Sequence, residues 1–295
     1  MKLQAKLRGT GVAIVTPFRK DYSVDFFSLE KLVRHVSGNG VNYLVVLGTT
    51  GESVTLNKEE KNAILNFVIE SNEKKLPVVA GFGGNNTHEI VNSIKHYDFT
   101  GIDAILSVAP YYNKPTQRGL YAHYKAIAEV SPVPVILYNV PGRTSVNMTA
   151  DTVLELAKDF KNIIAVKEAS GNFEQIMTIS KKRPADFMVI SGDDLITLPL
   201  ISCGIDGVIS VAANAFPSQF SNLVDLALKG KFKEAWEIQQ KLLEIFNTLF
   251  VEGNPAGVKA ALKILNICQD FLRLPLVQIS KNTYNKLAKQ IEELQ

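Results

Sequence analysis

Short runs of apolar residues, many of them β-branched, recur through most of the chain at intervals of roughly 19 to 35 residues. The eight runs begin at Val12, Tyr43, Val78, Ala104, Val135, Ile163, Met188 and Gly207. Nearly continuous apolar runs of this length are typical of parallel strands that are buried on both faces. This spacing limits the chain to the few architectures that alternate strands with helices.

The stretches between the runs have the three- and four-residue apolar spacing of amphipathic helices. Asn57, followed by Glu60 three residues later, predicts a helix start with a reciprocal cap. Eight such units predict an α/β fold of the (β/α)8 TIM-barrel type. A doubly wound sheet fits less well, because it has fewer strands and its nucleotide-binding form needs a Gly-x-Gly-x-x-Gly loop after the first run.

After about residue 218 only helical spacing remains. The apolar residues that follow it are Phe232, Trp236, Leu242, Leu243, Phe246 and Leu249. We expect Trp236 to anchor a core there rather than stack on a ligand, and Pro255 to open a further helix. The predicted division is a catalytic barrel over residues 1–229 and a C-terminal helical domain over residues 230–295.

Composition excludes several kinds of partner. Thirty-two Lys and Arg against 29 Asp and Glu give a net charge of +3, too small to indicate nucleic-acid or membrane binding. No apolar run reaches the length of a membrane span, and the first residues lack the apolar stretch of a signal peptide, so we expect a cytoplasmic protein. Two cysteines, expected to be buried, and four scattered histidines, expected to be solvated, predict neither a disulfide framework nor a metal site.

Lys167 is the unusual residue among the strand ends, where a barrel places its chemistry. It follows the run that begins at Ile163, so its side chain should enter the barrel. A buried amine tends to lose its proton and then becomes a nucleophile toward ketones, forming a Schiff base. From position alone, an ion pair with Glu168 or Asp193 is an equal alternative.

Other strand ends offer proton carriers and anion-binding groups. Tyr138 and Tyr112 could act as general acids or bases, although tyrosines at strand ends more often pack. Thr49 and Thr50 lie in a glycine-flanked turn whose backbone N–H groups could bind an anion. Arg143 could bind a carboxylate through two hydrogen bonds, or form a surface or interface ion pair.

Three segments taken together give a resemblance to a known family. They are Gly48-Thr49-Thr50-Gly51-Glu52, Tyr138-Asn139-Val140-Pro141-Gly142-Arg143 and Val166-Lys167-Glu168-Ala169. With these segments in this order, the chain resembles the dihydrodipicolinate synthase family of pyruvate-dependent class I aldolases over essentially its whole length.

The resemblance implies a lyase that condenses pyruvate with L-aspartate 4-semialdehyde, at the entry to diaminopimelate and lysine synthesis, without a metal or organic cofactor. Lys167 would form the Schiff base with pyruvate. The implied proton relay is Tyr138, Thr49 and Tyr112, and the implied substrate-binding residues are Thr49, Thr50, Arg143, Gly192 and Ile209. Tyr112 would reach across a subunit interface, and the family implies a homotetramer built as a dimer of dimers.

The alternative within the superfamily is N-acetylneuraminate lyase or another pyruvate-dependent class I aldolase. The lyase shares the glycine-rich turn, the tyrosine and the lysine. Arg143 favours the synthase, since the lyases typically lack an arginine there. A non-enzymatic barrel would leave all these residues without a use.

Feedback inhibition by lysine is a further implication of the family. The inhibitor pocket would match Ser53, Asn85, Glu89 and Tyr111. Glu89 would pair with the inhibitor's amine and Asn85 with its carboxylate. Lys58 and Lys61 stand where inhibited members often have histidine, which leaves the inhibition open.

Overall fold

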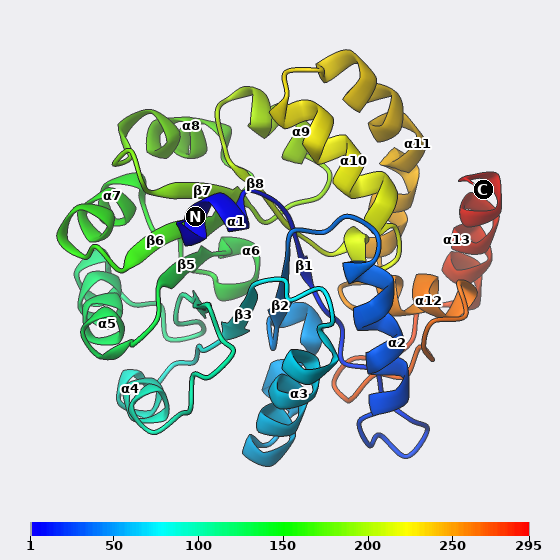
Figure 1. Ribbon diagram of the computed structural model, residues 1–295, viewed down its shortest axis with the longest axis horizontal. Coiled ribbons are helices and arrows are strands. Elements are labelled where there is room, and N and C mark those ends of the chain that lie inside the picture. The colour runs from blue at the N-terminus through cyan, green and yellow to red at the C-terminus, as the bar shows by residue number, and fades with distance from the viewer. Residues whose placement is uncertain (1, 295) are drawn as a thin grey trace.

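The computed structural model describes residues 2–294, and eight parallel strands in sequence order close into a barrel, with β8 paired to β1 (Figure 1). The strands are β1 (Gly9–Ala13), β2 (Tyr43–Val46), β3 (Val78–Gly81), β4 (Ala104–Val108), β5 (Val135–Asn139), β6 (Ile163–Glu168), β7 (Met188–Ser191) and β8 (Gly207–Ser210). The predicted TIM barrel is therefore confirmed.

Among the eight predicted strand starts, that of β1 differs from the structure, because the strand begins three residues before Val12. The sequence there is Gly9-Thr10-Gly11, which has no apolar run to reveal a strand. The ring of Tyr43 fills the space in front of Gly11, and a Cβ at that glycine would come within 2.2 Å of the ring. A glycine is required at this point because the neighbouring strand supplies the bulk.

Helices alternate with the strands and cover the outside of the barrel (Figure 1). They are α2 (Phe26–Ser37), α3 (Lys58–Ser71), α4 (Thr87–Lys95), α5 (Gln117–Val130), α7 (Ala150–Asp159), α8 (Phe173–Lys182), α9 (Thr197–Ser202) and α10 (Pro217–Leu228). The predicted cap of α3 is confirmed, since Asn57 accepts the Glu60 N–H and Glu60 accepts the Asn57 N–H.

Two apolar layers stabilise the barrel. One lies inside it and includes Val45, Ile136 and Ile190, and the other lies between the sheet and the helices. The short helix α1 (Leu3–Leu7) precedes β1 and places the fully buried Leu7 in the interior layer, at the N-terminal end of the strands. The opposite end, where the strands finish, is left for the polar residues of the site.

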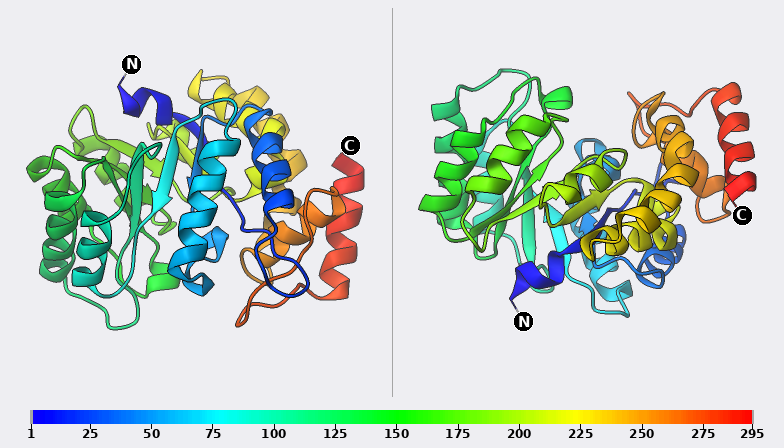
Figure 2. Two further views of the ribbon diagram at one scale, coloured as in Figure 1. Left: turned by 60° about the horizontal axis from the view of Figure 1, so that its bottom comes forward. Right: turned by 90° about the horizontal axis from the view of Figure 1, so that it is seen from above.

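The chain ends in three helices on one side of the barrel, α11 (Phe232–Phe250), α12 (Ala256–Ile264) and α13 (Lys281–Leu294) (Figure 2). Their buried side chains belong to the same apolar cluster as the outer layer of the barrel. The predicted boundary at residue 229 falls in the turn between α10 and α11, and a separate domain beyond it stays a prediction. Among the described helices, none combines the length and the apolar character that a bilayer crossing requires.

The expectation that Trp236 anchors the core of these helices is wrong, because its side chain is 47% exposed. Helix α11 buries the face that contains Ala235, Leu242 and Phe246. Trp236 is one position, or about 100°, away from Ala235 around the helix, which turns the indole toward solvent.

Candidate active site

Lys167 lies inside the mouth of the barrel. Ala165 belongs to the interior apolar layer and Val166 to the outer one, so the alternation of a strand turns Lys167 inward. The residue is 6% exposed, and its Nζ lies 4.2 Å from the centre of the Tyr138 ring. A lysine amine and a phenol are therefore neighbours in an enclosed space at the strand ends.

A register shift brings these two residues opposite each other. The pairing of β5 with β6 shifts between Val135 and Ile136, which inserts one extra residue into β6. Tyr138 pairs with Lys167 as a result. Without the shift Tyr138 would pair with Val166, whose side chain points outward, and the amine would lie elsewhere.

Both carboxylates considered as ion-pair partners of Lys167 are engaged elsewhere. Glu168 accepts hydrogen bonds from the Asn139 amide, at 3.1 and 3.2 Å, and from the Ser170 N–H at 2.8 Å. Its burial raises the pKa of its carboxyl group. Asp193 accepts a backbone N–H two residues further along. Among residues 2–294, the amine of Lys167 has no ion-pair partner and lies over the Tyr138 ring instead.

Thr49 and Thr50 lie in the 3-10 turn η1 (Thr49–Gly51) that follows β2. The Thr16 hydroxyl donates to the Gly51 carbonyl at 2.7 Å and ties the turn to the end of β1. Thr50 is 3% exposed, and its Oγ1 accepts a hydrogen bond of 3.0 Å from Nδ2 of Asn254. The turn is thus fixed by contacts from two distant segments.

Glu52 follows this turn in the left-handed conformation, with φ of 52°, which is strained for a residue other than glycine. Its carboxylate forms a fully buried ion pair with Lys259 of α12, with Nζ and Oε1 2.5 Å apart, and also accepts the Arg273 N–H. Burial lowers the pKa of the Lys259 ammonium. A second donor contact, from Nζ to the Phe271 carbonyl at 2.8 Å, completes the environment of the lysine.

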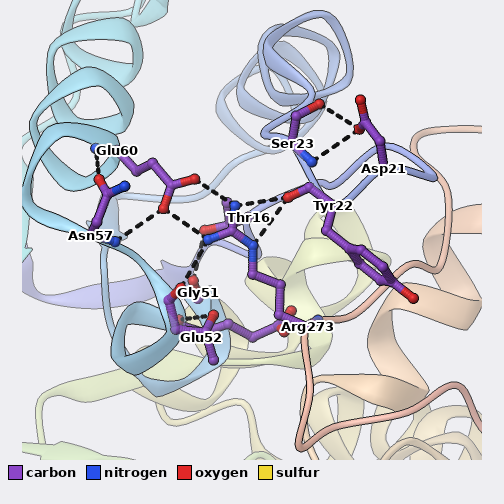
Figure 3. Close-up of polar contacts among 10 residues, drawn as sticks. Thr16, Asp21, Tyr22, Ser23, Gly51, Glu52, Asn57, Glu60 and Arg273 are labelled. Atoms are coloured by element: carbon purple, nitrogen blue, oxygen red, sulfur yellow. Dashed lines mark hydrogen bonds and ion pairs between the residues drawn. The ribbon is translucent and has the colours of Figure 1, made fainter.

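Arg273 connects Glu52 to α3 and to the loop after β1 (Figure 3). Its guanidinium donates to both carboxylate oxygens of Glu60, at 2.5 and 2.8 Å, and to the carbonyls of Thr55 and Tyr22. The bond to Arg273 lowers the pKa of Glu60, the residue that caps α3 together with Asn57. The C-terminal segment, α3 and the loop after β1 are therefore joined around η1 (Thr49–Gly51), which we call the threonine turn.

Gly192 and Ile209 lie at the same end of the barrel, directly after β7 and within β8, and Ile209 belongs to the interior layer with Tyr138. A Cβ at Gly192 would come within 2.7 Å of the Ala169 Cβ and 3.0 Å of the Lys167 Cε, so the lysine stem lies directly against this glycine. Ile209 is in β8 and is 1% exposed. The loop that follows β8 donates its first two N–H groups to Asp194, whose burial raises its pKa to about 6.

Tyr112 and Arg143 differ from the enclosed residues because both are exposed. Tyr112 follows β4, is 88% exposed and has φ of 72°. Arg143 projects from the short helix α6 (Pro141–Thr144), directly after the strand of Tyr138. Within one chain, the structure gathers Lys167 and Tyr138 at one point and leaves these two side chains at the outer edge.

The residues predicted to bind lysine are only partly gathered. A cavity of about 1020 Å³ lies beside the ends of β2 and β3, between α3 and α4, and its lining includes Lys58, Lys61, Asn85 and Glu89. Ser53 and Tyr111 are outside that lining, although the Tyr111 N–H donates to Asn85 at 2.8 Å. Neither Lys167 nor Tyr138 lines this cavity, so it is separate from the barrel mouth.

The expectation of solvated histidines is wrong for His123. Its ring is 4% exposed and its Nδ1 lies 2.8 Å from the Thr87 hydroxyl, because the residue is on the face of α5 that packs against α4. Burial lowers the pKa of His123 to about 4.

Within residues 2–294, no three His, Cys, Asp or Glu side chains are gathered as metal ligands would be. Of the two free cysteines, Cys268 is buried as expected, and Cys203 is partly exposed.

The sequence and the fold of this chain both match those of a known protein family. The family model described as the dihydrodipicolinate synthetase family matches residues 6–294. The chain belongs to this family. A 4-hydroxy-tetrahydrodipicolinate synthase from Phocaeicola vulgatus is 53% identical over 292 residues, covering 99% of this chain and 98% of the relative.

Solved structures of the family have the same fold as this chain. Dihydrodipicolinate synthase from Thermotoga maritima has a TM-score of 0.95 and 42% identity, covering 98% of this chain and 99% of that one. The enzyme from Cyanidioschyzon merolae with lysine bound has a TM-score of 0.94 and 39% identity, covering 98% of both chains. Membership in the dihydrodipicolinate synthetase family confirms the resemblance and the enzyme class, an aldolase-type lyase, and does not favour the N-acetylneuraminate lyase alternative.

Three residues around the site of this family member escaped the sequence analysis. They are Asn254, Lys259 and Arg273, which contact the threonine turn and its flanks from the C-terminal segment. Lys259 carried a signal, since it interrupts the apolar sequence Ala-Gly-Val-Lys-Ala-Ala-Leu, and a lysine in such a setting needs a buried partner. Arg273 carried a similar signal, since it interrupts the apolar sequence Phe-Leu-Arg-Leu-Pro-Leu, whereas Asn254, in the sequence Glu-Gly-Asn-Pro-Ala, carried none.

Proposed function

We propose that this protein catalyses the 4-hydroxy-tetrahydrodipicolinate synthase reaction, the condensation of pyruvate with L-aspartate 4-semialdehyde at the entry to diaminopimelate and lysine synthesis. The observation that carries the proposal is the amine of Lys167, buried at the barrel mouth 4.2 Å from the Tyr138 ring. The names of relatives about 50% identical over nearly the whole chain support the same reaction.

The chemistry follows from the lysine. Its amine adds to the ketone carbon of pyruvate, and loss of water gives a Schiff base that withdraws electrons from the methyl group. Removal of a methyl proton gives an enamine, which forms a carbon–carbon bond to the aldehyde carbon of the second substrate. The amino group of that substrate then attacks the Schiff-base carbon, which closes the ring and releases Lys167.

The other residues move protons and bind carboxylates in this proposal. Tyr138 exchanges protons beside the amine, with Thr49 and Tyr112 as the remaining members of the relay. Thr49 and Thr50 bind the pyruvate carboxylate, and Arg143 binds the carboxylate of the semialdehyde. Backbone groups at Gly192 and Ile209 line the pocket, and neither a metal nor an organic cofactor takes part.

A Schiff-base trap and a coupled assay test the proposal together. Borohydride treatment with pyruvate should add a reduced pyruvyl group to the wild type and to Lys161→Ala, an exposed control, but not to Lys167→Ala. Turnover of both substrates, read as NADPH consumption by the next reductase, should follow the same pattern. Trapping of pyruvate without turnover of the semialdehyde would reject the synthase assignment and retain the Schiff base.

We further propose that the active unit is a dimer within a homotetramer, because Tyr112 is 88% exposed in one chain and is free to enter a neighbour's site. Subunit mixing tests this arrangement. Lys167→Ala and Tyr112→Phe chains, each impaired alone, should regain activity when mixed, since one site in each mixed dimer then has both residues. Mixtures no more active than the mean of the two variants would place Tyr112 in its own subunit's site.

We also propose lysine inhibition through the cavity beside β3, and a cytoplasmic location. Glu89 and Asn85 line that cavity, and a family member from Cyanidioschyzon merolae has been crystallised with lysine bound. Glu89→Ala should abolish inhibition by added lysine while activity without lysine is unchanged. An unaltered response would remove this site. The free Cys203 and Cys268 suit a reducing compartment.

A further inference from the structure

Among residues 2–294, the C-terminal segment contacts the threonine turn through a single side-chain hydrogen bond. Asn254 precedes α12, and its Nδ2 donates to Oγ1 of Thr50 at 3.0 Å. The two residues are 7% and 3% exposed, so water does not compete for this bond. In the described part of the chain, the Thr50 hydroxyl accepts this bond and donates its own proton to no acceptor.

A hydroxyl has one proton to donate and can accept from a neighbour at the same time. Because Asn254 occupies an accepting position of Thr50, the proton of that hydroxyl must point elsewhere. We propose that Asn254 is a positioning residue that directs the Thr50 proton toward the carboxylate of the bound 2-oxo acid. This inference rests on the proposed function, which places that carboxylate at the threonine turn.

Two further observations support a dedicated role. The buried ion pair between Glu52 and Lys259 joins the same two segments, two residues after Thr50 and five residues after Asn254, so the donor and acceptor are held at a fixed separation. The other amide atom, Oδ1 of Asn254, is buried without a partner in the described chain. Within residues 2–294, the side-chain amide of Asn254 therefore makes its one hydrogen bond to the Thr50 hydroxyl.

Asn254→Asp reverses the direction of the hydrogen bond with almost no change of shape. A carboxylate cannot donate, so it takes the Thr50 proton and removes it from the substrate. The loss of a hydrogen bond to a charged group is worth about a ten- to hundredfold change in binding. We therefore expect the KM for pyruvate to rise by that factor with a smaller change in kcat, and to recover as the pH falls and the new carboxyl group is protonated.

Asn254→Ala separates this chemistry from packing. Alanine leaves the hydroxyl free to turn toward the substrate, so the KM should rise less than with Asn254→Asp. Asn72→Asp, a buried amide far along the chain at the end of α3, is the matched control and should leave the KM unchanged. A larger effect of alanine than of aspartate would show a structural role and overturn the proposal.

A double variant completes the test. In the Thr50→Val background, Asn254→Asp should change the KM for pyruvate less than about twofold, because neighbours in one hydrogen-bonded unit are not additive. Full additivity would overturn the proposal. Failure of the positioning role of Asn254 can be told apart from failure of the proposed function by trapping pyruvate on Lys167 at saturating concentration. Trapping fails in the wild type only if the proposed function is wrong.

Discussion

The buried ion pair between Glu52 and Lys259 gives a sharp prediction about stability. Both side chains are 0% exposed, and Nζ and Oε1 are 2.5 Å apart. Lys259→Met keeps the length and apolar stem of the side chain but leaves the Glu52 carboxylate buried with only the Arg273 N–H as a donor. Removing one partner of such a pair costs about 3 to 5 kcal/mol, which corresponds to a melting temperature lower by roughly 5 to 8 °C for a chain of this size.

Differential scanning calorimetry of five proteins checks this value: the wild type, Lys259→Met, Glu52→Gln, the double variant and a surface control. Glu52→Gln with Lys259→Met removes both charges, and should recover most of the loss, because neither an unpaired anion nor an unpaired cation is then buried. Lys289→Met breaks an exposed pair with Glu293 on α13 and should leave the melting temperature almost unchanged. If the Glu52 and Lys259 substitutions add, or if Lys259→Met melts with the wild type, the pair is not the anchor described above.

Three further predictions use other contacts. Gly192→Ala should lower kcat by roughly ten- to hundredfold in steady-state assays, because the new Cβ would displace Ala169 or the stem of Lys167; unchanged kcat would mean that the pocket relaxes. His123 has its pKa lowered to about 4 from 6.5, so the stabilisation it gives is complete above pH 6.5 and is lost as the pH falls toward 4. Denaturant titrations should show that His123→Gln loses less stability over that range, by on the order of 3 kcal/mol, and equal losses would contradict the burial argument. Asn57→Ala should cost about 1 kcal/mol through the lost cap of α3, read from the same titrations, whereas no loss would show that Arg273 alone fixes that helix end.

The sequence predicted the barrel well because its signal is local. Each strand is a run of buried apolar residues, and each helix has its own periodicity, so neither depends on distant contacts. The start of β1 was missed where Gly9 and Gly11 replace the apolar run, since the bulk there comes from Tyr43 of the next strand. Trp236 was misassigned because α11 has apolar residues on more than its buried face.

In the candidate site too, the residues marked by a local sequence pattern could be predicted, and the long-range contacts could not. Lys167 could be predicted because a lysine after an apolar strand is conspicuous, and the structure places it next to Tyr138. The register shift that aligns the two residues has no local sign. Asn254 contacts Thr50 in the threonine turn, and Lys259 contacts Glu52 directly after it, each across more than 200 positions. A pairing of that range is set by packing of the whole fold rather than by any short pattern.

The ion pair between Glu52 and Lys259 also sets an order of events during synthesis. The two residues are 207 positions apart, so a ribosome that adds about 5 to 20 residues per second produces the lysine roughly 10 to 40 s after the glutamate. All eight strands precede Lys259 in the chain. The nascent protein thus has every strand of its barrel before the cation that allows the Glu52 carboxylate to leave water. The contacts that Asn254 and Lys259 make with Thr50 and Glu52 can form only after the barrel strands have been synthesised. A polypeptide released after β8 but before residue 254 would have all eight strands but would lack these contacts at the end of the barrel that contains Lys167.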